Sequence, residues 1–108
     1  VYGALAQGIG LALSEDFEDL KKHTTLVKCG IPQIEDVPDA LDVHYAKPEY
    51  SKRPDGPFGA SGVGEGPLAA PHPAILNAIF NATGARVTKV PATPDLEALD
   101  ELASKAEA

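Results

Sequence analysis

The glycine-rich run GASGVGEGP, at residues 59–67, constrains this chain more than any other feature. It places four glycines in eight positions before Pro67, so neither a helix nor a strand is stable across it. Exposed N–H groups in a loop that leads to a helix N-terminus suit oxyanions. The run therefore predicts a long loop between two structured parts. Either a binding loop or an ordinary turn fits these residues.

A helix is expected at the start of the chain, because apolar residues recur there every four positions: Val1, Leu5, Ile9 and Leu13. Its other positions are small and include three glycines, each of which costs a helix about 0.8–1 kcal/mol relative to Ala. Such a helix is expected to let another backbone or a ligand approach closely. The helical pattern is already under way at Val1, so we expect a cut end there.

Two more helices are expected after the glycine-rich run. The first has an apolar stripe and ends at Gly84; the stripe comprises Ala74, Ile75, Ala78, Ile79 and Ala82. The second begins at Thr93, a good N-cap followed by Pro94, and has Leu96, Leu99 and Leu102 as its buried side.

Short strands are expected at residues 24–27, 41–45 and 86–90, where 41–45 alternates apolar and polar residues. The predicted fold class is α+β: three helices, two or three short strands and one long glycine-rich loop, as a fragment of a larger domain.

Composition excludes several classes of function. Nine basic residues against sixteen acidic ones give a net charge of −7, which argues against a nucleic-acid partner. Cys29 is the single cysteine, so it forms no internal disulfide and cannot hold an iron–sulfur cluster, which generally takes four cysteines. No apolar run reaches the roughly 18 residues of a membrane span, and no signal peptide is evident. A cytoplasmic location is the default expectation.

Glu65 is the one acid among the glycines and the main candidate for chemistry. A carboxylate there could act as a base, or it could simply complement the dipole of the following helix. The other candidates are weaker. The three histidines, His23, His44 and His72, lack metal-ligand spacing, and Cys29 has no base near it in sequence. Ser61 lies in GASGV, which lacks the closing glycine of a nucleophile elbow.

The residues from 53 onward resemble the C-terminal signature of the xanthine oxidase family of molybdenum hydroxylases. The family pattern is a Gly-Val-Gly-Glu turn, Pro-Leu, a helix ending in Ala-Thr-Gly, and a Pro-x-Thr-Pro helix start. All four elements occur here, at 62–65, 67–68, 82–84 and 91–94. Upstream, ALAQGIG at 4–10 resembles the family helix whose Gln-Gly pair approaches the cofactor. The run RPDGPFGASGVGE is similar to the aldehyde-oxidising members from sulfate-reducing bacteria.

This resemblance implies that residues 1–108 are the C-terminal part of a molybdenum-cofactor-binding domain. It implies an enzyme that oxidises aldehydes to carboxylic acids with water as the oxygen source, Glu65 being the general base. The implied cofactors are molybdopterin cytosine dinucleotide, whose dithiolene holds the molybdenum, and two [2Fe–2S] clusters bound elsewhere in the parent. The expected cofactor contacts come from Gln7 and Gly8 and from the loop residues Ala60, Ser61, Gly62, Val63 and Gly64.

The expected partners are the remainder of the same enzyme, a small aldehyde and further copies of a homo-oligomeric parent. The chain departs from the family pattern at Gly66, where Pro or a larger residue is common after the glutamate. Two other functions remain open. A non-catalytic acidic accessory or interaction module would explain the size and charge, and a purine or N-heterocycle hydroxylase of the same family would carry the same motifs.

Overall fold

The first helix, α1, spans Tyr2–Leu13, as the sequence predicts. The computed structural model describes residues 1–45, 56–92 and 101–105. The buried positions of α1 are its small residues Ala4, Gly8, Gly10 and Ala12, whereas Leu11 and Leu13 are exposed. Small side chains let neighbouring backbone come close, so α1 packs through its small residues, while the predicted apolar stripe is only partly covered.

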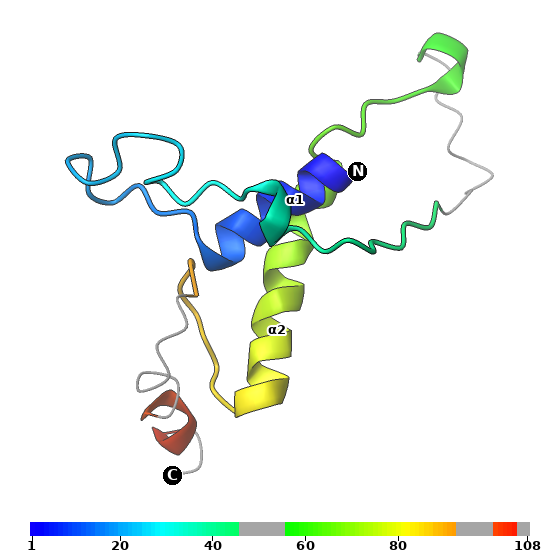
Figure 1. Ribbon diagram of the computed structural model, residues 1–108. Coiled ribbons are helices and arrows are strands. Elements are labelled where there is room, and N and C mark those ends of the chain that lie inside the picture. The colour runs from blue at the N-terminus through cyan, green and yellow to red at the C-terminus, as the bar shows by residue number, and fades with distance from the viewer. Residues whose placement is uncertain (46–55, 93–100, 106–108) are drawn as a thin grey trace.

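The second helix, α2, spans Pro71–Thr83 and follows the short 3-10 helix η3, Gly66–Ala69. Pro71 at its first position has the backbone angle that a helix start requires. The helix ends at Gly84, whose φ of 74° is left-handed and whose N–H donates to the Phe80 carbonyl at 2.8 Å. The predicted glycine stop is confirmed. Both η3 and α2 pack against α1 (Figure 1).

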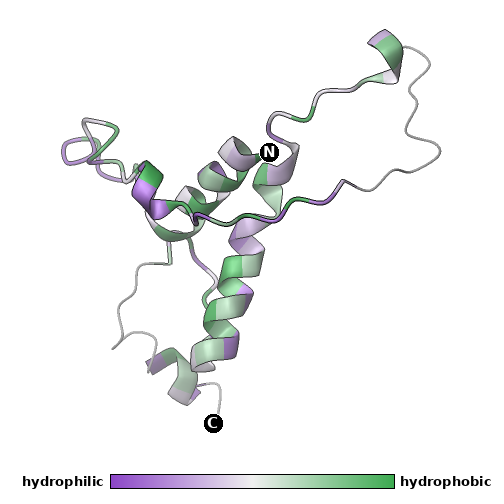
Figure 2. Ribbon diagram, turned by 45° about the vertical axis from the view of Figure 1, so that its right-hand side comes forward, coloured by the Kyte–Doolittle hydropathy of each residue, from purple (hydrophilic) through white to green (hydrophobic). Residues whose placement is uncertain are grey.

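The core of the described residues is very small. It consists of four alanines and one cysteine: Ala4, Ala12, Cys29, Ala85 and Ala92. After α2 the chain returns to the end of α1, where the Ala92 N–H donates to the Ala12 carbonyl at 2.6 Å. No larger side chain in the described part of the chain is fully buried. Figure 2 shows apolar residues along both helices without a surrounding layer.

Two loops leave the helices in different directions (Figure 1). The first, residues 14–30, is closed at its base, where the Asp16 N–H donates to the Cys29 carbonyl at 3.0 Å and the Ser14 hydroxyl donates to Gly30 at 2.6 Å. It is followed by the 3-10 turn η1, Ile34–Asp36, capped by Gln33. The second loop contains the glycine-rich run and the 3-10 turn η2, Pro57–Gly59.

The predicted α+β class is wrong, because no strand occurs among residues 1–45, 56–92 and 101–105. Residues 24–27 form turns in which the Cys29 N–H donates to the Thr25 carbonyl at 2.9 Å. Residues 41–45 and 86–90 have no described neighbour that pairs with their backbone. A strand needs such a neighbour to satisfy its N–H and C=O groups. Alternating hydrophobicity alone does not supply one.

The third predicted helix is helical at 101–105, but its proposed start at Thr93 and Pro94, and the residues Leu96 and Leu99, lie outside the described residues. Leu102 is described and is exposed rather than buried. The radius of gyration is 17.7 Å, whereas a compact domain of this length has about 13 Å. No helix within the described ranges is long and apolar enough to cross a membrane.

Candidate functional site

The glycine-rich loop begins at a tight turn that displays an aromatic ring. Phe58 has a left-handed φ of 52°, and its side chain is fully exposed. The turn is closed by two hydrogen bonds, from the Gly59 N–H to the Gly56 carbonyl at 3.0 Å and from the Ala60 N–H to the Pro57 carbonyl at 2.9 Å. The Ala60 N–H is therefore already used within the loop.

The glycines that follow have no role in packing the described residues. A Cβ added at Gly62, Gly64 or Gly66 would meet no atom within 4 Å, and none of the three has a positive φ. The N–H groups of residues 61–64 donate to no other residue that the structure describes. This part of the loop therefore presents free donors beside glycines that leave room for close approach.

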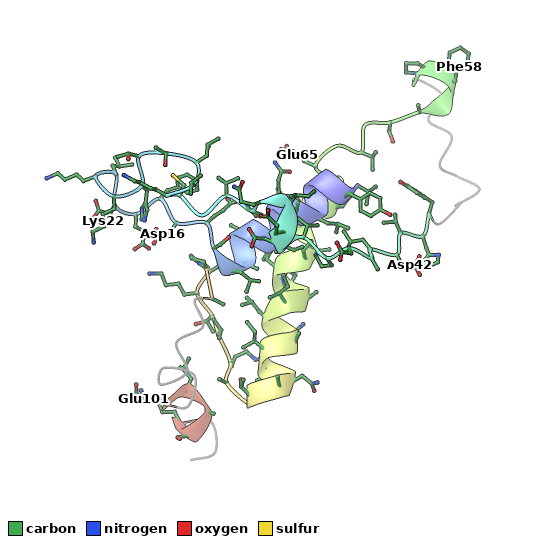
Figure 3. All side chains as sticks on the ribbon, viewed as in Figure 1. Asp16, Lys22, Asp42, Phe58, Glu65 and Glu101 are labelled. Atoms are coloured by element: carbon green, nitrogen blue, oxygen red, sulfur yellow. The ribbon has the colours of Figure 1, made fainter. Side chains whose placement is uncertain are left out.

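Glu65 lies at the end of this loop, immediately before η3. Its backbone carbonyl accepts the Leu68 N–H at 3.1 Å, which anchors it to the first turn of η3. Its side chain is exposed, and its carboxylate has no hydrogen bond or ion pair with another described residue. Figure 3 shows Glu65 where the loop returns to the helices, whereas Phe58 lies at the far tip.

Gln7 lies on α1 with its side chain exposed. It lines a hollow of about 360 Å³ together with Glu15, Pro32 and Leu68, among others. Leu68 belongs to η3, the element that begins directly after Glu65. The structure thus brings the Gln7 amide and Leu68 of η3 to one hollow, although Leu68 lies 61 positions after Gln7 in the sequence.

Gly8, the other member of the Gln-Gly pair, is buried on a different side of α1. A Cβ at Gly8 would lie 2.7 Å from Cγ and 2.8 Å from Cβ of Pro71, and 3.1 Å from the Leu68 carbonyl oxygen. Its surroundings are therefore filled by η3 and the start of α2. No local pattern predicts this contact, since Pro71 lies more than sixty positions from Gly8. No local pattern predicts Glu15 as a neighbour of Gln7 either.

The remaining candidates are dispersed. His44 lies 2.9 Å from Asp42, and His23 Nδ1 accepts the Asp19 N–H at 3.2 Å. Nδ1 of His72, in the first turn of α2, is buried without a hydrogen bond. Cys29 is buried with its Sγ 3.5 Å from the His23 carbonyl. Within the described ranges, no three His, Cys, Asp or Glu side chains are grouped to hold a metal ion.

Comparison with known proteins supports the motif resemblance over nearly the whole chain. The aldehyde oxidoreductase of Megalodesulfovibrio gigas is 63% identical over 101 residues, which is 92% of this chain and 11% of that protein. The gamma subunit of the 6-hydroxypseudooxynicotine dehydrogenase complex of Paenarthrobacter nicotinovorans is 38% identical over 101 residues, 88% of this chain and 12% of that protein. No family model matches.

A solved structure shows the same conformation. The aldehyde oxidoreductase of Desulfovibrio desulfuricans superposes with a TM-score of 0.80 and 58% sequence identity, over 94% of this chain and 11% of that one. The chain thus spans about a ninth of the length of the relatives it matches. The predicted similarity to aldehyde oxidoreductases is confirmed for the sequence and for the conformation.

Proposed function

Because this chain corresponds over almost its whole length to one segment of aldehyde oxidoreductases, we propose that it is the C-terminal part of a molybdenum-cofactor-binding domain. Its whole protein would oxidise aldehydes to carboxylic acids, with Glu65 as the general base. The observation that carries this proposal is the 63% identity to the Megalodesulfovibrio gigas enzyme. The similar conformation of the Desulfovibrio desulfuricans enzyme supports it independently.

The exposed surface supports the role of a segment within a larger body. The chain exposes 8570 Å², whereas a compact monomer of its mass would expose about 5,700 Å². Two loops expose large apolar side chains. The 14–30 loop exposes Leu20, Leu26 and Val27, and the second loop exposes Phe58. Patches of this kind usually mark protein contacts. We therefore assign the remainder of the same enzyme as the partner, and homo-oligomerisation of that enzyme stays a prediction.

The residues fit a cofactor that carries an anionic dinucleotide and a metal-oxo centre. The free N–H groups of Ser61, Gly62, Val63 and Gly64 are donors suited to oxyanions, and the glycines leave space for close approach. Ala60 is less suited through its backbone, since its N–H is already bonded to Pro57. When bound, molybdopterin cytosine dinucleotide would supply the oxygen-transfer and electron-accepting chemistry.

Glu65 would accept a proton at its carboxylate as the water-derived oxygen is transferred to the aldehyde carbon. Its carboxylate is not engaged by any described residue, so both oxygens are available for this role. Its backbone is held by the Leu68 N–H, which fixes the point from which the side chain extends. Gln7 can donate and accept hydrogen bonds, and its position on the hollow beside η3 suits a contact with the cofactor.

The comparisons favour aldehydes over purines or other N-heterocycles as the substrate class. Identity is higher with the aldehyde oxidoreductase than with the 6-hydroxypseudooxynicotine dehydrogenase subunit, 63% against 38%. The two [2Fe–2S] clusters would be bound outside this chain, whose single cysteine is buried. A cytoplasmic location stays a prediction.

The test is Glu65→Gln in the intact enzyme. Glutamine keeps the size of the side chain but cannot accept the proton, so kcat and kcat/KM should fall together by about 10²–10⁴-fold. Molybdenum content should equal that of the wild type. Glu35→Gln is the matched control, because Glu35 is an exposed acid in η1 outside the proposed site. A fully loaded Glu65→Gln enzyme with more than about a tenth of wild-type turnover would refute the assignment.

A further inference from the structure

Gly8 lies where α1, which carries Gln7, meets η3, which begins directly after Glu65. The proposed site needs these two elements at a fixed distance from each other. Gly8 follows Gln7 on α1, and it faces the Leu68 carbonyl of η3 and Pro71, the first residue of α2. Gly8 is buried, so the contact is internal to the chain. Any side chain at position 8 would have to occupy space that Pro71 and Leu68 already fill.

The distances show how little tolerance this contact has. An added Cβ would lie 2.7 Å from Pro71 Cγ, about 0.7 Å short of the 3.4 Å at which ordinary contact begins. One of the three nearest atoms is backbone, the Leu68 carbonyl oxygen at 3.1 Å, and the others belong to a rigid proline ring. Neither group can swing aside as a flexible side chain would. The η3 segment would therefore have to move as a unit.

Other glycines of α1 do not share this property. A Cβ at Gly3 would meet nothing within 4 Å. At Gly10 the near atoms come from Pro32 and from the far end of the Glu15 side chain, and none of the three belongs to η3. Gly8 is therefore the one glycine of α1 whose missing side chain sets the approach of η3.

We propose that Gly8 is a positioning residue: its lack of a side chain sets the distance between Gln7 on α1 and η3, and thereby the place of the Glu65 carboxylate. This inference rests on the proposed function of Glu65. It assigns Gly8 a packing role in place of direct contact with the cofactor. The link to Glu65 is short, since the Leu68 N–H donates to the Glu65 carbonyl and the Leu68 carbonyl faces Gly8.

The test is Gly8→Ala in the intact enzyme, with Gly3→Ala as the matched control on the same helix. Misplacing a reacting group by about 1 Å can cost 10²-fold in rate. We expect kcat to fall by about 10–100-fold with KM nearly unchanged, while Gly3→Ala keeps wild-type kinetics. Hydrogen exchange of the segment 66–71, measured by mass spectrometry with and without cofactor, should accelerate only in Gly8→Ala.

A double variant covers the case in which Gly8→Ala does not assemble. Pro71→Gly removes both proline atoms that the new Cβ would meet, so Gly8→Ala/Pro71→Gly should recover assembly and part of kcat relative to Gly8→Ala. Failure of the double variant to improve on the single one would overturn the inference. Wild-type kinetics and exchange in Gly8→Ala would overturn it as well. Either result leaves the proposed function intact if Glu65→Gln is inactive, whereas an active Glu65→Gln removes the proposed function itself.

Discussion

The base of the 14–30 loop depends on Gly30 for two independent reasons. Its φ of 75° is left-handed, and an added Cβ would collide with the Ser14 carbonyl, lying 2.7 Å from the Ser14 carbonyl carbon. Gly84 has almost the same φ, 74°, but a Cβ there would meet nothing within 4 Å. The two glycines therefore form a matched pair in which Gly30→Ala adds a steric cost to the conformational cost that both substitutions share.

The expected free energies follow from these two contributions. A left-handed alanine costs about 1–2 kcal/mol, and the reduced freedom of the unfolded chain offsets about 0.4–1 kcal/mol of this. Gly84→Ala should therefore weaken its local structure by roughly 0.5–1 kcal/mol. Crowding at a packed site adds about 1–3 kcal/mol. Gly30→Ala should therefore cost about 1.5–4 kcal/mol.

Native-state hydrogen exchange of the intact enzyme measures this difference directly. The reporter for Gly30→Ala is the Asp16 amide, bonded to the Cys29 carbonyl, and the reporter for Gly84→Ala is the residue 84 amide, bonded to Phe80. Because each 1.4 kcal/mol is a tenfold change, protection at Asp16 should fall by about 10–700-fold and at residue 84 by no more than about fivefold. Equal losses in the two variants would refute the steric argument.

Two further outcomes follow from the site and from the exposed surface. In the intact protein, the proposed contact of Gln7 with the cofactor predicts that Gln7→Ala leaves a hydrogen-bonding group of the cofactor unpaired, at a cost of about 1–3 kcal/mol. Molybdenum retention or turnover should then fall while the fold is preserved, and full molybdenum content with unchanged kinetics would contradict the proposed contact. The isolated 108 residues should be inactive and unfold without a cooperative transition, because the core of the described part of the chain consists of alanines and one cysteine. A sharp thermal transition together with a dispersed amide NMR spectrum would show that they fold alone.

The helices could be predicted from sequence because their signals are local. Apolar spacing places α1, and an apolar stripe with a glycine stop places α2 and its end at Gly84. The glycine-rich loop was predictable for the same reason, since four glycines in eight positions exclude regular structure. The similarity to aldehyde oxidoreductases also came from short local motifs, and the comparisons confirm it.

The strand prediction was wrong because pairing is a property of two segments, which the pattern of one segment does not reveal. Residues 41–45 alternate as a strand does, yet the hydrogen bond that joins them to α1 comes from a side chain, the Tyr2 hydroxyl, which donates to the Leu41 carbonyl at 3.0 Å. The small residues of α1 were expected to let another backbone approach, and the Leu68 carbonyl beside Gly8 confirms this. Periodicity favours the larger residues as the core, but the neighbouring backbone lies so close that Gly8 and the alanines fill it instead.

The candidate site likewise combines a feature that is contiguous in the sequence with contacts between residues far apart in it. The position of Glu65 among glycines ahead of a helix can be read from the amino-acid sequence, because this arrangement is contiguous in the chain. The hollow that Gln7 shares with Leu68 and the contact of Gly8 with Pro71 are visible only in the folded chain. These contacts join residues about sixty positions apart, and the angle and distance between α1 and η3 that create them arise from packing, which no local pattern encodes.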